Sequence, residues 1–188
     1  PDLGARLGEA VEDLLAARER ACTWVVDPEE AGTIAGGIKK TYGRGCDAMA
    51  TARKSPTGET LHEWRKRVKY HWYHTRLLRE LWPDHMVHRA ELAHVLSGYL
   101  GDHHDCHVFE HTVLEDPSCF AGPEEVEAIV ALARRRRARL EERAHRLGKR
   151  LLADSHEVLV KRWSAWWDSR DDEADLRERL PDVHPVDV

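Results

Sequence analysis

The sequence lacks several features that define other classes of protein. No apolar run approaches the roughly 18 residues that a membrane-spanning helix needs, and stretches such as 128–133 are among the longest. No basic segment followed by an apolar one marks a leader. The four cysteines, Cys22, Cys46, Cys106 and Cys119, show no CxxC spacing, which excludes a zinc ribbon or disulfide framework and predicts buried thiols. These absences predict a cytoplasmic protein.

Charge is unevenly distributed along the chain. The formal net charge is -5, charged residues make up 34% of the sequence, and the mean hydropathy is -0.62. This composition suits long amphipathic helices with solvated outer faces. Residues 2–30 and 168–187 are acidic, whereas residues 62–79 and 134–150 are strongly basic. A surface that binds anions must therefore arise from segregation of charge along the chain.

Apolar residues recur at helical spacing, and no window alternates as a strand would. We therefore predict an all-α protein, an antiparallel helical bundle of about six helices. The predicted helices span residues 3–25, 28–54, 60–82, 84–115, 124–153 and 155–180. The predicted organisation is a leading helix at 1–27, a helical bundle at 28–182 and a C-terminal tail at 183–188.

The third predicted helix carries a basic row beside its apolar stripe. The stripe consists of Leu61, Trp64, Val68, Trp72, Thr75 and Leu78. The row consists of His62, Arg65, Lys66, Lys69, Tyr73 and Arg76. Like charges at this spacing repel by roughly a few tenths of a kcal/mol per pair. Two interpretations are open: an anion lies along the row, or Glu59, Glu63 and Glu80 partly neutralise a solvated face.

Basic residues also flank the apolar faces of two other predicted helices. Lys39, Lys40 and Arg44 lie beside the apolar face of the second, and Arg137 falls on the apolar seam of the fifth. A charge on a seam needs a partner, which is either a buried carboxylate or an anionic ligand in a cavity. The other basic residues of 134–150 are predicted to be mostly solvated. In an antiparallel bundle, the basic flanks can converge on one groove.

Histidines replace aliphatic residues toward the end of the fourth predicted helix, after two glycines that permit close helix approach. His103, His107 and His111 share a face at four-residue spacing. They are interpreted as a metal site or as hydrogen-bonded core residues. A third interpretation joins the cluster to the basic row, with His104 donating to a phosphate oxygen and Asp105 orienting a neighbouring cation. We predict no metal and no cofactor, because no second cluster supplies further ligands.

Three motifs, in this order, resemble the CHAD domain, the conserved histidine α-helical domain. The motifs are GIKKTY at 37–42 with Arg44, LHEWRKRVK at 61–69, and LGDHHD at 100–105. The resemblance covers about residues 31–167. It implies two antiparallel helical bundles related by a pseudo-twofold axis, with a basic cavity between them that binds inorganic polyphosphate.

The resemblance also marks individual residues and partners. The marked positions are Lys40, Arg44, His62, Arg65, Lys66, Lys69, His104 and Asp105. Family members often accompany a CYTH triphosphate-tunnel domain and associate with polyphosphate granules, so the resemblance implies the same partners here. It carries no implication for the metal interpretation, since His107 and His111 lie outside the matched motif.

The chain departs from the family pattern because it holds one copy of the His-Arg-Lys motif. It resembles mainly the C-terminal half of the domain, and residues 1–26 look like the tail of a missing first half. The chain begins with Pro1 and lacks a starting Met, which suggests a longer protein. Either the first half is absent, or two chains associate as a homodimer to restore the cavity.

The residues and the resemblance together predict a protein that binds polyphosphate and is not an enzyme. Arg and Lys would hold the polymer as they hold a nucleic-acid backbone. A metal-dependent phosphohydrolase domain, accessory or catalytic, is one alternative, although no Walker loop is present and the carboxylates lie mostly outside the basic segments. A helical module that binds nucleic acid is the other, although the tryptophans fall largely on apolar stripes.

Overall fold

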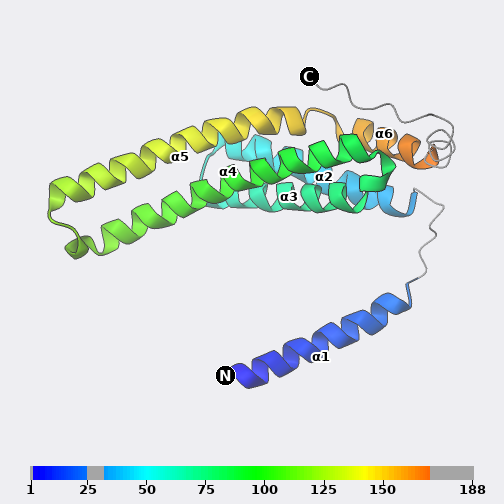
Figure 1. The fold of residues 1–188 in the computed structure, drawn as a ribbon, viewed down its shortest axis with the longest axis horizontal. Coiled ribbons are helices and arrows are strands. Elements are labelled where there is room, and N and C mark those ends of the chain that lie inside the picture. The colour runs from blue at the N-terminus through cyan, green and yellow to red at the C-terminus, as the bar shows by residue number, and fades with distance from the viewer. Residues whose placement is uncertain (1, 25–31, 170–188) are drawn as a thin grey trace, which may run out of the picture. The chain divides into compact units, whose positions relative to one another are not determined.

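Six α-helices make up most of what the structure, a computed structural model, describes: residues 2–24 and 32–169 (Figure 1). They are α1 (Leu3–Cys22), α2 (Gly32–Lys54), α3 (Gly58–Leu77), α4 (Pro83–Glu115), α5 (Pro123–Leu151) and α6 (His156–Asp168), with 3-10 turns η1 (Arg79–Leu81) and η2 (Pro117–Cys119). Within these ranges there is no strand, so the prediction of an all-α bundle is confirmed. None of these helices combines the length and hydropathy that crossing a membrane requires. The predicted start of the second helix at Pro28 and the end of the sixth at 180 lie outside the described residues.

The chain divides into two compact units, residues 1–33 and 34–188. The first contains α1, whose N-terminus is capped by Asp2: the Oδ1 atom accepts a hydrogen bond of 3.2 Å from the backbone N–H of Gly4. No residue of α1 is buried. Its exposed apolar stripe consists of Leu3, Leu7, Val11, Leu14 and Leu15. The predicted division at residues 27 and 182 stays a prediction.

The second unit is built around two apolar clusters. The first joins α2, α3, α4 and α5 around Trp64, which is fully buried. The second joins α2, α4, α6 and the residues that follow α5 around Tyr42 and Trp163. Helix α4 packs against α3 along one side and against α5 along another. The two clusters therefore fix the positions of the helices that carry the basic residues.

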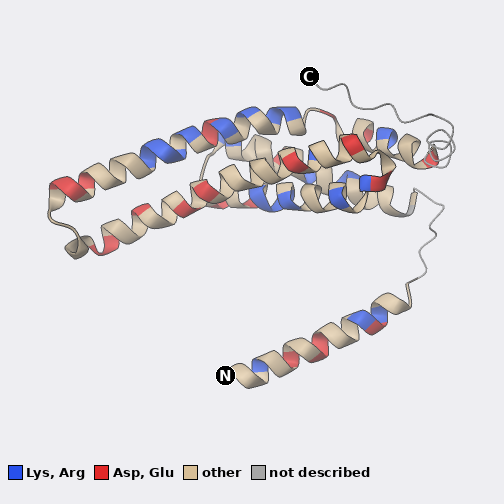
Figure 2. Cartoon of the chain, viewed as in Figure 1, with Lys and Arg blue, Asp and Glu red and all other residues tan. Residues whose placement is uncertain are grey.

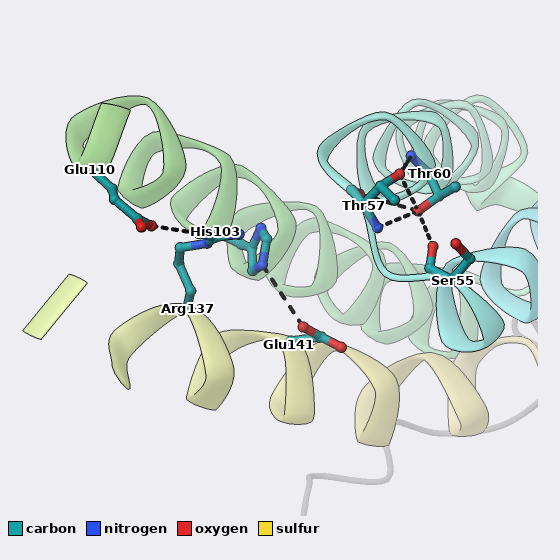
Figure 3. Close-up of polar contacts among 7 residues, drawn as sticks. All are labelled: Ser55, Thr57, Thr60, His103, Glu110, Arg137 and Glu141. Carbon is teal, nitrogen blue, oxygen red and sulfur yellow. Dashed lines mark hydrogen bonds and ion pairs between the residues drawn. The ribbon is translucent and has the colours of Figure 1, made fainter. Parts of the chain in front are cut away.

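The start of α3 is set by threonine side chains (Figure 3). The backbone N–H of Thr60 donates to the Thr57 hydroxyl at 3.2 Å, and the backbone N–H of Thr57 donates to the Thr60 hydroxyl at 2.9 Å. The Thr60 hydroxyl also donates to the carbonyl of Ser55 at 2.7 Å. These bonds satisfy backbone groups that a helix end leaves unpaired. They fix where α3 begins and hence where its basic row lies.

A buried histidine occupies a position that the apolar stripe did not predict. His71 is 3% exposed, whereas Trp72, assigned to the stripe, is only partly buried. The Nε2 atom of His71 accepts a hydrogen bond of 3.0 Å from Nε of Arg89, and Nη2 of Arg89 donates to the carbonyl of Leu151 at 2.8 Å. The Tyr42 hydroxyl donates to the same carbonyl at 3.4 Å. Burial, followed by the charge of Arg89, lowers the pKa of His71 well below its ordinary value, so the ring is neutral at pH 7.

The four cysteines are free thiols, but the prediction that they are buried is wrong. Cys22 and Cys119 are exposed, and Cys46 and Cys106 are half-buried. Cys22 lies at the end of α1, which buries none of its residues, and Cys119 lies in the surface turn η2.

Gly148 allows α5 to approach the buried Trp64. A Cβ atom at position 148 would lie 2.5 Å from Cζ2 of Trp64 and 3.0 Å from Sδ of Met49. We therefore expect Gly148→Ala to lower the free energy of unfolding by about 1–3 kcal/mol, because the overpacking outweighs alanine's helix propensity. Urea unfolding followed by circular dichroism would measure this.

Gly98→Ala is the matched control, because a Cβ at position 98 of α4 meets nothing within 4 Å. This substitution should raise the free energy of unfolding by about 0.5–1 kcal/mol. Equal stabilities of the two variants would contradict the assigned role of Gly148.

Candidate functional site

Four of the predicted cationic residues lie in a row along the side of α3 that borders α4: His62, Arg65, Lys69 and Arg76. We call this row, together with His104 of α4, the α3–α4 seam. Residues spaced by three, four and seven positions share one side of a helix. Contacts at both His62 and Arg65 show that this side faces α4.

Arg65 is held against the backbone of α4. Its Nε donates to the carbonyl of Ser97 at 3.3 Å. A Cβ at Gly101 would lie 3.2 Å from this Nε and 3.3 Å from Nη2, so the absence of a side chain there leaves room for the guanidinium. Among the described residues, Arg65 has no acidic partner, although it is half-buried. Arg65 is therefore a positioned cation with donors to spare.

Histidines from two helices meet at the start of the seam. The rings of His62 and His104, both exposed, have centroids 6.1 Å apart. His107 lies nearby, since a Cβ at Gly58 would be 3.6 Å from its Cδ2. Imidazole N–H groups from two helices can donate to a common anion. Asp105 is exposed, and its predicted orienting role stays a prediction.

Two other predicted site residues are paired with carboxylates. Nζ of Lys66 lies 2.5 Å from Oε2 of Glu63, whose pKa is lowered mainly by this hydrogen bond and then by Arg67. Nζ of Lys39 lies 3.6 Å from Oε1 of Glu157. The interpretation that acidic neighbours neutralise part of the α3 face therefore applies to Lys66.

Lys40 and Arg44 lie on α2, which borders a different side of α3. A Cβ at Gly45 of α2 would lie 3.8 Å from Cβ of Arg67, and Arg67 is two positions after Arg65, which places it on the opposite side of α3 from the seam. Both Lys40 and Arg44 are exposed. In the described ranges, no hydrogen bond, ion pair or ring contact links them to the seam, so the convergence of the basic flanks on one groove stays a prediction.

Arg137 has a carboxylate partner (Figure 3). Its Nη1 lies 2.6 Å from Oε2 of Glu110. Nε of Arg134 lies 2.6 Å from Oε1 of the same carboxylate. Glu110 is buried, and hydrogen bonds, first from Arg134 and then from Arg137, lower its pKa. The sequence left two partners open for Arg137, a buried carboxylate or an anionic ligand, and the structure shows the carboxylate of Glu110. Sequence reasoning missed Glu110, although it lies seven residues after His103 on the same face of α4.

His103 faces α5 and not the seam (Figure 3). Burial, and next the charge of Arg137, lower the pKa of His103 to about 4. Its Nε2 is 4.0 Å from Oε2 of Glu141, but the ring is neutral at pH 7 and forms no ion pair there. Across the described residues, no three or more His, Cys, Asp or Glu side chains are placed to hold a metal ion. His103, His107 and His111 thus do not form the site that the metal interpretation required.

Tyr73 and Arg76 lie at the other end of the seam, where apolar side chains surround the basic ones. They line a groove of about 700 Å³ between α3 and α4 whose walls are mainly apolar side chains. The guanidinium carbon of Arg76 is 5.3 Å from the ring centroid of Trp72, and the Trp72 ring is 4.7 Å from that of His94. The basic residues of the seam that lie outside this mainly apolar groove therefore run from His62 to Lys69.

Comparison with known proteins identifies the family. The model of one family, described as CHAD domain, matches residues 4–114, more than half of the 188 residues, from α1 to the end of α4. The family indicated by the sequence motifs is thereby confirmed, whereas the matched range differs from the predicted range of about 31–167. At the family level, CHAD domains are known for binding polyphosphate and are generally binding domains. Searches of curated proteins and of solved structures find no match to this chain.

The low pKa of His103 makes stability depend on pH. In the unfolded chain, His103 becomes protonated as the pH falls below about 6.5. In the folded protein, it stays neutral until about pH 4. Its contribution to stability is therefore complete above about pH 6.5 and is lost between there and pH 4, by at most about 1.4 kcal/mol per pH unit. We expect His103→Gln to reduce the fall in unfolding free energy between pH 6.5 and 4.5.

Urea unfolding at a series of pH values would measure this difference. His88→Gln, which replaces an exposed histidine on the same helix, is the control, and the larger change of slope is expected in His103→Gln. A wild-type slope in His103→Gln would show that this histidine titrates normally in the folded protein.

Proposed function

Because this chain belongs to the CHAD domain family, we propose that it binds inorganic polyphosphate along the α3–α4 seam and does not act on it chemically. The observation that most supports this is the placement of Arg65. Its guanidinium is held by the backbone of α4 and has no acidic partner among the described residues. It lies in a row with His62 and Lys69, and His104 adds a donor from the other helix.

The shape of the seam suits a linear polymer. His62 and Lys69 are seven positions apart, which at about 1.5 Å per residue gives a row about 10 Å long. Charge-assisted hydrogen bonds from Arg and Lys to successive phosphates would replace the hydration of these cations. Binding would release counterions, so affinity would fall steeply with salt concentration.

Residues that already have partners would contribute differently. The pair of Lys66 with Glu63 is exposed, and such pairs contribute about 0–1 kcal/mol, so a phosphate can replace the carboxylate at little cost. The pair of Lys39 with Glu157 is also exposed, so a phosphate can replace that carboxylate at similarly little cost. The pair of Arg137 with buried Glu110 is costly to break, which supports a structural contribution for Arg137. Lys40 and Arg44 would contact a longer polymer that extends past α3.

The main alternative is a metal-dependent phosphohydrolase. Such an enzyme needs carboxylates or histidines that hold a divalent ion beside the phosphates. Two carboxylates that pair with predicted site residues, Glu63 and Glu110, are each engaged by two cations. This arrangement supports binding over catalysis.

We further propose that a second copy of the chain covers the apolar stripe of α1. Five large apolar side chains on one face of α1 are exposed, and burying such a stripe against another is favourable. A dimer would place two seams in one assembly. A CYTH partner and polyphosphate granules are implied by the family resemblance alone.

The seam is tested by replacing Lys69 together with the neighbouring Lys66, as Lys66→Ala combined with Lys69→Ala. We expect weaker binding of polyphosphate and a salt dependence whose log–log slope is smaller by about one for each phosphate that a cation no longer neutralises. Helicity should not change, because neither side chain is buried. Fluorescence titrations at several salt concentrations, with circular dichroism, would measure both.

Lys149→Ala with Arg150→Ala is the control, because it removes the same charge from exposed positions at the end of α5. An equal loss of affinity in both variants would show that binding depends only on net charge, and it would contradict the proposed binding along the seam. Sustained phosphate release with magnesium or manganese would contradict a purely binding role, and preference for duplex DNA at equal salt would favour the nucleic-acid alternative.

Dimerisation is tested by Leu7→Glu with Leu14→Glu in the full chain. These changes put charges on the apolar stripe, so a dimer should dissociate in sedimentation equilibrium. Ala5→Glu with Ala16→Glu, on the opposite face of α1, should leave it intact. A monomeric wild type would contradict the proposal.

A further inference from the structure

Three exposed arginines on α5 lie along a groove without acidic partners. Arg135, Arg139 and Arg143 are four residues apart, which places them on one side of the helix. They line a groove of about 560 Å³ between α4 and α5, together with Tyr99 and Leu140. Within residues 2–24 and 32–169, no carboxylate forms an ion pair with any of the three.

Four other arginines of α5 are paired with carboxylates. Arg134 and Arg137 share Glu110, and Arg146 pairs with Glu142. Asp102, the carboxylate that lines the groove, lies 3.4 Å from Arg136. The carboxylates of α4 and α5 are thus distributed so that one side of α5 keeps its charge.

This uncompensated row is unfavourable without a ligand. Arginines four residues apart on an exposed helix repel each other, and the groove contains two such pairs. Leu140 is buried and Tyr99 half-buried, so the floor of the groove is partly apolar and strengthens electrostatic attraction there. An anion lying over this floor would relieve the repulsion.

The groove is separate from the α3–α4 seam. Tyr99 lies two residues from Ser97 and two from Gly101, the contacts of Arg65 on α4. At about 100° per residue, two residues correspond to roughly 200°, so Tyr99 is on the opposite side of α4. Figure 2 shows Lys and Arg gathered on α3 and on α5, the two helices that pack against α4.

We infer that Arg135, Arg139 and Arg143 form a second polyanion site that binds the phosphates of a second polyphosphate segment. The ligand class rests on the proposed function, but the location does not. Guanidinium groups bind phosphate oxygens in a bidentate manner, and the row is about 12 Å long at about 1.5 Å per residue. A nucleic acid is less favoured, because the one aromatic side chain in the groove, Tyr99, is half-buried in its floor. One chain would then bind two polymer segments on opposite sides of α4.

The test compares three variants of the full chain by isothermal titration with a short polyphosphate of defined length. The groove variant is Arg135→Gln, Arg139→Gln, Arg143→Gln. The control, Arg146→Gln, Lys149→Gln, Arg150→Gln, removes the same charge from the same helix outside the groove. The seam variant is Lys66→Ala, Lys69→Ala. We expect two polyphosphate segments per chain in the wild type and control, and one in the groove variant with circular dichroism unchanged.

The outcomes separate this inference from the proposed function. A groove variant that titrates like the control overturns the groove, whatever happens at the seam. If the seam variant still binds one segment, and adding the groove substitutions abolishes it, the groove is supported. If instead the groove variant loses all binding and the seam variant loses none, the groove is supported and the seam placement fails. Tighter binding of duplex DNA than of polyphosphate at this groove overturns the ligand assignment.

Discussion

The contact between Trp64 and Gly148 is the constraint on which the rest of the structure depends. The indole is fully buried, and α5 can pass over it only because residue 148 has no side chain. This contact sets the distance between α3 and α5, and Ala93, Leu96 and Leu100 of α4 complete the same cluster. Arg65 follows Trp64 directly, so the packing of the indole determines where the guanidinium meets α4.

The distribution of carboxylates decides which cations are available to a ligand. The chain is acidic overall, with a net charge of -5, yet its acidic residues do not neutralise its basic residues evenly. Glu63 and Glu110 each engage two cations, whereas Arg65 has a backbone carbonyl as its partner. A protein with a negative net charge can therefore carry strongly cationic surfaces.

Much of the fold could be predicted from the sequence, because helical periodicity and Pro or Gly breaks are local signals. Helix ends such as Lys54 and Glu115 coincide with the predicted ones. The pattern failed at His71, because which of two adjacent residues is buried depends on the angle at which Trp163 and Arg89 approach. Such an angle is a property of the assembled bundle.

The candidate site was only partly predictable for a similar reason. Spacing identified the row on α3, but the partner of each charge depends on the neighbouring helix. Periodicity placed Arg137 on the apolar seam and indicated that it needs a partner, but it could not show whether that partner is Glu110 or an anionic ligand. The pair of Lys66 and Glu63 could be predicted from the sequence, because residues three apart on a helix are neighbours.

The carbonyl of Leu151 has a consequence for how the bundle opens. This group at the end of α5 accepts hydrogen bonds from Arg89 of α4 and from Tyr42 of α2. Fraying of the last turn of α5 would break the hydrogen bonds of Nη2 of Arg89 and of the Tyr42 hydroxyl to this carbonyl. Arg89 also donates to His71 through Nε, so the loss would affect that buried ring as well. The end of α5 is thereby prevented from opening alone, so amide protons of α2, α4 and the last turn of α5 should exchange with solvent together.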